Sequence, residues 1–176
     1  NIHVYDALSR TDEIKHYLIR NEQTSTLVAS GYARASGEPG IALTVSGPGA
    51  SNAATGIGDA YADCVPVLLV TGGTAASLDG RDRSKCVHGL DQAAFFAPIT
   101  RFFARPKQVQ EIPQAVVGAF RALRAPRPGP AVIELPIDIV TSEGSVSIPA
   151  FVPGERPTPD TDSVRQAACV LQGCKR

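Results

Sequence analysis

Glu22 is the first candidate for a residue that takes part in chemistry, because of where it stands. It follows an apolar run at residues 16–19 and precedes a run of small residues that predicts a helix. A glutamate in a first helical turn stabilises the helix by about 0.3–1 kcal/mol, because the N-terminal end of the helix dipole is positive. A carboxylate at the end of a strand could instead serve a ligand beside a sheet. On these residues alone, a helix-start role with Asn21 as N-cap is the simpler interpretation.

The second candidate is the sequence SGPGASN at residues 46–52, which follows an apolar run and opens a helical pattern. Gly47 and Gly49 let the backbone turn sharply or approach a ligand, and Pro48 fixes its own φ. Amides at the helix start would point at whatever lies over the strand end. A dinucleotide-binding G-x-G-x-x-G loop is a weak match, because Asn52 replaces its third glycine. By itself this loop is better explained as an ordinary tight turn.

The third candidate is His88, which follows the charged segment DGRDRSK at residues 79–85. An imidazole gives or takes a proton near neutral pH, which suits acid–base catalysis. A solvated loop histidine explains the same residue equally well, and the residues leave both interpretations open.

Composition indicates one globular domain and excludes several classes of protein. Of the 176 residues 43% are apolar, enough for a sizeable core, and 17 basic residues balance 17 acidic ones. A net charge of zero removes the usual electrostatic reason to expect a nucleic-acid partner. The longest apolar run, at residues 65–70, is too short to span a bilayer, and no secretory signal is visible. We therefore expect a cytoplasmic protein with neither a membrane nor a nucleic-acid partner.

The cysteines agree with this location. The four cysteines show no paired spacing and no metal-like spacing with the three histidines; they are residues 64, 86, 169 and 174. Reduced thiols of a cytoplasmic protein are the preferred interpretation.

Strand-like runs alternate with helical patterns along most of the chain. Several runs lack polar alternation, as is typical of parallel strands buried on both faces. The predicted strands are 16–19, 40–46, 65–71, 100–105 and 130–136, and the predicted helices lie near 22–36, 50–62, 91–97 and 108–124. This alternation predicts an α/β fold, a three-layer α/β/α domain with a mainly parallel sheet.

The composition of the sequence changes after residue 140. Residues 141–162 are polar and rich in proline, which predicts a linker, and residues 163–176 resemble the first helix of a further domain. The chain begins and ends inside helical patterns, so we expect it to be a piece of a longer polypeptide, with its first domain, residues 1–140, truncated at the N-terminus.

Taken together, the motifs resemble the pyrimidine-binding (PYR) domain of thiamine-diphosphate-dependent enzymes, most closely the acetolactate synthase branch. The resemblance covers residues 1 to about 140, and the tail resembles the start of the central domain that follows in these enzymes. The matching motifs occur in the family's order: RNEQ (20–23), GYARASGEPG (31–40), SGPGASN (46–52), DAYADCVPVLLVTG (59–72), LDQAAFFAPITRFFAR (90–105) and RPGPAVIELPIDIV (127–140).

The resemblance assigns roles to the candidate residues. In the family, a glutamate hydrogen-bonds N1′ of the cofactor's aminopyrimidine ring and so promotes loss of the C2 proton; Glu22 matches it. The glycine-rich motif lines the pyrimidine pocket of the partner subunit, which makes Pro48, Gly49 and Asn52 the expected cofactor-binding residues. The resemblance therefore favours a catalytic role for Glu22.

Two departures from the family pattern bear on substrate and cofactor. The common RHEQ is RNEQ here, with Asn21 in place of histidine. The biosynthetic synthases carry FQE ahead of LDQ, with the glutamine beside the thiazolium, whereas this chain has His88 there, within Val87–Gly89. A histidine at this place resembles flavin-free, catabolic-type synthases and some carboxyethyl-transferring relatives. The acceptor substrate and any need for FAD therefore stay open.

The resemblance implies a carboligase or decarboxylase acting on 2-keto acids such as pyruvate, with thiamine diphosphate as cofactor. Mg²⁺ and the diphosphate are expected to bind a domain outside this chain, so the chain alone should be inactive, and a homodimer or tetramer is implied. Alternatives are a 2-hydroxyacyl-CoA lyase, an oxalyl-CoA decarboxylase or a benzaldehyde lyase. Two other classes are a non-catalytic PYR-like oligomerisation domain and a nucleotide-binding module, for which no ribose-binding acidic residue is suitably placed.

Overall fold

The computed structural model describes residues 2–152, 154 and 158–174. Its centre is one parallel sheet with the strand order β1-β2-β4-β3. The strands are β1 (Gly40–Thr44), β2 (Val67–Gly73), β3 (Phe102–Ala104) and β4 (Ala131–Pro136).

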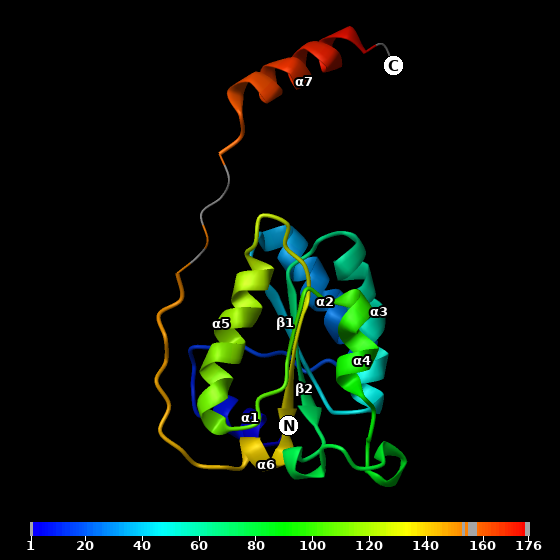
Figure 1. Ribbon diagram of the computed structural model, residues 1–176, viewed down its shortest axis with the longest axis vertical. Coiled ribbons are helices and arrows are strands. Elements are labelled where there is room, and N and C mark those ends of the chain that lie inside the picture. Colours follow the sequence, from blue (N-terminus) through cyan, green and yellow to red (C-terminus); the bar gives the residue numbers. More distant parts are fainter. Residues whose placement is uncertain (1, 153, 155–157, 175–176) are drawn as a thin grey trace.

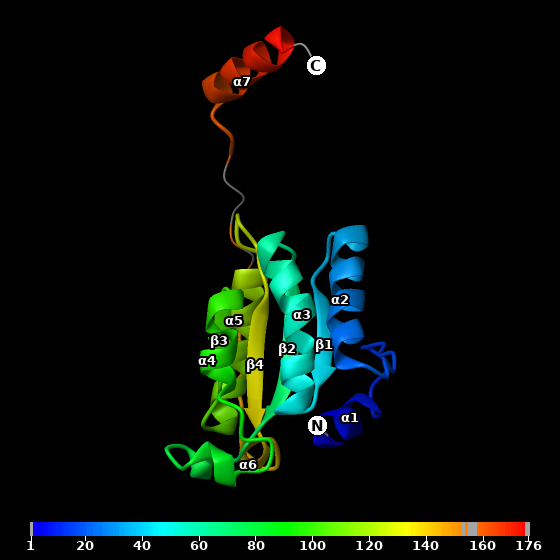
Figure 2. The same cartoon turned by 90° about the vertical axis from the view of Figure 1, so that its right-hand side faces the viewer.

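Helices cover both faces of this sheet, as Figures 1 and 2 show. The helices are α1 (Ile2–Leu8), α2 (Glu22–Ser36), α3 (Pro48–Ala62), α4 (Gln92–Phe96), α5 (Ile112–Leu123), α6 (Ile137–Val140) and α7 (Thr161–Gly173), with short 3₁₀ turns η1 (Ala76–Leu78), η2 (Arg83–Lys85), η3 (Ala97–Ile99) and η4 (Val109–Glu111). Helices α2, α3 and α4 lie on one face and α5 on the other (Figure 1). The predicted three-layer α/β/α architecture is confirmed.

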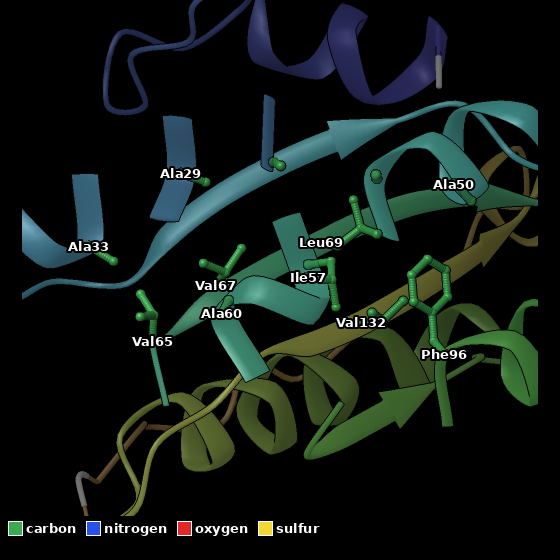
Figure 3. Close-up of a cluster of buried hydrophobic side chains, with 12 residues drawn as sticks. Ala29, Ala33, Ala50, Ile57, Ala60, Val65, Val67, Leu69, Phe96 and Val132 are labelled. Atoms are coloured by element: carbon green, nitrogen blue, oxygen red, sulfur yellow. The ribbon is translucent and has the colours of Figure 1, made fainter. Parts of the chain in front are cut away.

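The core divides between the two faces because side chains alternate along β2. Val67 and Leu69 pack with α2, α3 and Phe96 of α4 (Figure 3), whereas Leu68 packs against α5. Since β2 is an interior strand with both faces covered, its sequence is continuously apolar from Val67 to Val70.

Most predicted elements are present with boundaries shifted by a few residues. Helix α2 has the predicted bounds, because the Asn21 side chain accepts a hydrogen bond from the Thr24 amide (3.0 Å) and Gly37, at φ 74°, ends the helix. The predicted strand at 16–19 is wrong. Tyr17 and Leu18 are 80% and 85% exposed, and no strand among the described residues pairs with this segment, so its backbone has no sheet to join.

The segment after α6 differs from the domain before it. Residues 141–152 form no helix or strand, although Phe151 makes an edge-on ring contact with Phe120 of α5 at 5.9 Å. Helix α7 is exposed along its length and lies apart from the sheet (Figure 2). The domain boundaries at 140 and 162 stay predictions, and residues 153 and 155–157 of the predicted linker lie outside the described residues. No helix in the described part of the chain is both long and apolar enough to cross a membrane.

Helices α2 and α3 approach closely because their facing residues are small. The Thr26 hydroxyl donates a hydrogen bond to the Ala53 carbonyl at 3.0 Å, and Gly56 lies directly against Thr26. A Cβ on Gly56 would lie 2.7 Å from Thr26 Cβ and 2.9 Å from the Leu27 amide nitrogen. The position of Glu22, at the start of α2, therefore depends on this contact.

We predict that Gly56→Ala lowers the free energy of unfolding by about 1–3 kcal/mol, because the added methyl group forces the two helices apart. Gly58→Ala on the same helix is the control. A Cβ there meets no atom within 4 Å, so this change should stabilise the chain by about 0.5–1 kcal/mol. Urea-induced unfolding of both variants measures the difference, and equal effects would contradict the close packing at Gly56.

Candidate functional site

The candidate site lies at the edge of the sheet where the parallel strands end (Figure 2). The turn after β1, the loop after β2 and helix α6 after β4 all meet there. Ligands of open α/β sheets bind at this edge, because the loops carry the functional groups.

Glu22 is half-buried at the first position of α2, where it lines a hollow of about 200 Å³. Its Oε2 accepts a hydrogen bond from Asn52 Nδ2 at 3.3 Å. Apolar and hydroxyl-bearing residues together complete the lining of this Glu22 hollow: Tyr5, Ile19, Ser25, Leu43, Thr44 and Val45. The structure thus brings together two predicted site residues, Glu22 and Asn52, whereas Asn21 caps the helix.

Residues 46–52 form the turn and first helical residues that support Glu22. Gly47 has φ 61°, which favours glycine, and Pro48 is the first residue of α3. Gly49 is buried, and a Cβ on it would lie 2.5 Å from Val45 Cγ1 and 3.5 Å from Glu22 Cγ. The tight turn predicted from the sequence is therefore present, and it also contacts the candidate carboxylate. Pro48 itself is exposed.

His88 packs on the other side of the same turn. Its Nδ1 lies 3.3 Å from the Ser46 hydroxyl, within hydrogen-bonding distance. His88 has φ 56°, an uncommon backbone conformation for a residue with a side chain. A Cβ on Gly47 would lie only 2.7 Å from His88 Cβ, so His88 can pack in this position only because residue 47 is a glycine.

A larger hollow of about 500 Å³ opens beside His88. Aliphatic side chains dominate its lining, with Lys85 as a cation and Cys86 as a thiol; the remaining lining residues are Val4, Val45, Ser46, Gly72, Gly73, Thr74, Ala75, Leu78, Val87, Leu135, Ile137 and Val140. Val45 lines both this His88 hollow and the Glu22 hollow. The two predicted catalytic residues therefore lie on opposite sides of the end of β1.

Several polar residues that position this site were not identified from the sequence. Gln92 is 1% exposed and donates to the Gly72 carbonyl at 2.8 Å while accepting from the Thr71 hydroxyl at 3.1 Å. The position of Gln92 in the motif LDQ is the sequence signal from which it could have been identified. Glu134 is also 1% exposed and forms an ion pair with Arg105. For Glu134, the sequence signal was a charged residue within the otherwise apolar run AVIELP.

Asp138, on α6, fixes the wall of the His88 hollow. Its two carboxylate oxygens accept hydrogen bonds from the amides of Ala76 (2.8 Å) and Ser77 (3.1 Å). Partial burial by itself raises the pKa of Asp138, but the two amide hydrogen bonds outweigh it and hold the pKa below the ordinary value. The ionised carboxylate is therefore the form that holds the segment.

Metal-binding groups are not assembled in this part of the molecule. Across residues 2–152, 154 and 158–174, no group of three or more His, Cys, Asp or Glu side chains is placed to hold a metal ion. Where Mg²⁺ would bind stays a prediction.

We predict that Gly47→Ala displaces His88 and lowers the free energy of unfolding by more than about 2 kcal/mol, because strain at positive φ adds to a steric clash. Gly80→Ala is the matched control, since Gly80 has φ 81° but a Cβ there meets nothing within 4 Å. The imidazole NMR signals of His88 should shift in the first variant and stay unchanged in the second. Unaltered His88 signals in Gly47→Ala would contradict the packing described here.

Comparison with known proteins assigns this chain to a family. The family model described as "Thiamine pyrophosphate enzyme, N-terminal TPP binding domain" matches residues 1–95; thiamine pyrophosphate is another name for thiamine diphosphate. The chain is 35% identical to the acetolactate synthase isozyme 1 large subunit of Escherichia coli K12 over 175 residues. This alignment covers 98% of this chain and 31% of that protein.

Two further relatives give the same picture. The acetolactate synthase large subunit of Lactococcus lactis is 38% identical over 161 residues, 88% of this chain and 28% of that protein. A probable 2-ketoarginine decarboxylase of Pseudomonas aeruginosa is 36% identical over 167 residues, 93% of this chain and 30% of that protein. The chain spans less than a third of each of these relatives. It belongs to the thiamine pyrophosphate enzymes and carries their N-terminal cofactor-binding domain, in a form similar to that of the acetolactate synthases.

Proposed function

We propose that this chain is the aminopyrimidine-binding part of a carboligase or decarboxylase acting on 2-keto acids such as pyruvate. The observation that carries the proposal is the Glu22 carboxylate, which lines a hollow of mixed apolar and polar side chains at the strand ends and accepts a hydrogen bond from Asn52. Two of the relatives are named for making acetolactate and for decarboxylating 2-ketoarginine, which supports the substrate class.

The residues around Glu22 fit one end of thiamine diphosphate. An aminopyrimidine is a flat ring with hydrogen-bonding nitrogens, and it needs apolar walls together with one polar partner. Leu43 and Val45 supply walls and Glu22 supplies the partner. Asn52 Nδ2, by donating to Oε2, orients the carboxylate. Thiamine diphosphate, when bound, contributes a carbon nucleophile that attacks the substrate's carbonyl.

The chain's own residues divide the remaining work. Glu22 holds a proton at N1′ of the aminopyrimidine, and its half-buried position excludes some of the water that would compete for this hydrogen bond. His88, across Val45 from Glu22, exchanges a proton with the substrate in the larger hollow. Pro48 and Gly49 shape the turn, so that Asn52 reaches the carboxylate.

The proposal assigns the rest of the site to parts outside this chain. Mg²⁺ and the diphosphate bind a separate domain, and the complete site forms between subunits of a cytoplasmic homodimer or tetramer. A non-catalytic oligomerisation domain is the weaker alternative, because it has no use for a carboxylate oriented into a hollow by an amide.

We predict that Glu22→Gln in the full-length protein slows hydrogen–deuterium exchange at C2 of bound thiamine diphosphate by about 10²–10⁴, the range for losing a positioned acid–base group. The fold should survive, since glutamine can also occupy a helix start. NMR of quenched samples measures the exchange. Glu38→Gln is the control, because Glu38 is exposed and lies just beyond the far end of α2. Equal exchange in all three proteins would reduce Glu22 to a helix-start residue.

We predict that His88→Gln retains the fold and cofactor binding but changes turnover and its dependence on pH near neutrality, because glutamine cannot exchange a proton. His88→Ala should lose more activity, since it also removes hydrogen bonding. Turnover against pH with pyruvate as donor compares the three proteins. Coincident profiles would make His88 a solvated loop residue.

A further inference from the structure

Segment 74–79 forms one wall of the His88 hollow and has little secondary structure of its own. Thr74, Ala75 and Leu78 of this segment line the hollow, and its only regular element is the single 3₁₀ turn η1. A segment of this kind keeps its shape through contacts with the rest of the domain. Those contacts therefore decide the shape of the hollow.

One guanidinium group joins this segment to the sheet. Arg105 follows β3, and its Nη2 donates to the Thr74 carbonyl at 2.8 Å while its Nη1 donates to Asp79 Oδ2 at 2.9 Å. Its Nε donates to Glu134 Oε1, on β4, at 2.9 Å. Arg105 thus holds the first and last residues of segment 74–79 against β4. A planar group with several fixed donors suits this task better than a lysine ammonium.

The ion pair between Arg105 and Glu134 is deeply buried. The side chains are 12% and 1% exposed. Burial raises the pKa of Glu134 above its ordinary value, although Arg105 beside it pulls the pKa down. Gly73 makes room for the carboxylate, since a Cβ there would lie 2.5 Å from Glu134 Oε1. A buried pair of this kind contributes little net stability compared with apolar side chains, so a role in positioning explains it better.

We propose that Arg105 is a positioning residue, which fixes segment 74–79 and thereby the wall of the hollow in which the substrate meets His88. Asp138 holds the middle of the same segment through the Ala76 and Ser77 amides, so Arg105 controls mainly its two ends. The role of the hollow in substrate binding rests on the proposed function. The attachment of the segment by Arg105 does not.

The test separates positioning from stability by removing the whole buried pair. Arg105→Met alone would leave a buried, unpaired carboxylate and destabilise the fold. Arg105→Met combined with Glu134→Leu in the full-length protein removes both charges. We expect thermal stability close to that of wild type and amide hydrogen exchange in segment 74–79 faster by about tenfold or more. The KM for pyruvate should rise by about tenfold, because misplacing binding groups by about 1 Å costs up to ~10² in rate. Exchange at cofactor C2, which depends on Glu22, should be unchanged.

Two single variants complete the experiment. Asp79→Ala removes only the outer contact of Arg105, and its side chain is 36% exposed, so the fold should tolerate the change. It should speed amide exchange in segment 74–79 in the same direction, by less. Arg34→Met is the control, because Arg34 also bridges two carboxylates, Asp59 and Asp63, and its further hydrogen bond goes to Ser30, all outside the segment. It should leave both exchange and KM unchanged.

Wild-type amide exchange in segment 74–79 of both the paired variant and Asp79→Ala would overturn the proposal. If the paired variant does not fold, Asp79→Ala decides alone, because it keeps the buried pair. Faster exchange of the segment with an unchanged KM would overturn the link to the substrate. Absence of any thiamine-diphosphate-dependent turnover in the wild-type protein would instead refute the proposed function, while amide exchange would still test the attachment by Arg105.

Discussion

The turn after β1 is packed closely against its neighbours. A Cβ on Gly47 would lie 2.7 Å from His88 Cβ, and a Cβ on Gly49 would lie 2.5 Å from Val45 Cγ1, whereas Glu22 Cγ lies 3.5 Å from that second position, in ordinary van der Waals contact. Because only glycine fits at both places, the two hollows can share the single wall at Val45. The relative position of carboxylate and imidazole is therefore set by backbone packing, with few freely rotating groups between them.

This packing is possible because the sheet is parallel and its helices lie close together. In a parallel sheet the turns after β1, β2 and β4 all lie at one edge, which brings residues from three regions of the chain to one place. Small residues between α2 and α3, such as Ala53 and Gly56, bring the start of α2 close to the start of α3. Glu22 and Asn52, near the two helix starts, then come within hydrogen-bonding distance.

Local features of the sequence were sufficient to predict most of the fold. Helix α2 was predicted to the residue, since its cap at Asn21 and its glycine stop at Gly37 are local signals. The strand at 16–19 was wrong because an apolar run becomes a strand only where another strand pairs with it, and that depends on distant parts of the chain. The contact of Glu22 with Asn52 agrees with their shared assignment to one site from the family resemblance. The roles assigned to the site residues remain predictions. The ion pair of Arg105 and Glu134 joins ordinary residue types through tertiary contacts, and sequence spacing does not predict it.

The two sides of the site are held by different physical forces. Glu22 is positioned by apolar packing between α2 and α3. The wall beside His88 is held by hydrogen bonds between the charged side chains of Arg105 and Asp138 and its backbone. The two carboxylates of this wall, Asp138 and Glu134, act on stability with opposite sign. The pKa of Asp138 is lowered, so its contribution is fully present above the ordinary aspartate pKa of about 3.9 and is lost as pH falls through the lower folded value. The pKa of Glu134 is raised by burial, so its ionisation costs stability as pH rises through the folded value. The wall thus combines a carboxylate whose ionisation stabilises the fold with one whose ionisation opposes it. The second is explained if fixing Arg105 in place matters more to the protein than the stability that an apolar pair would provide.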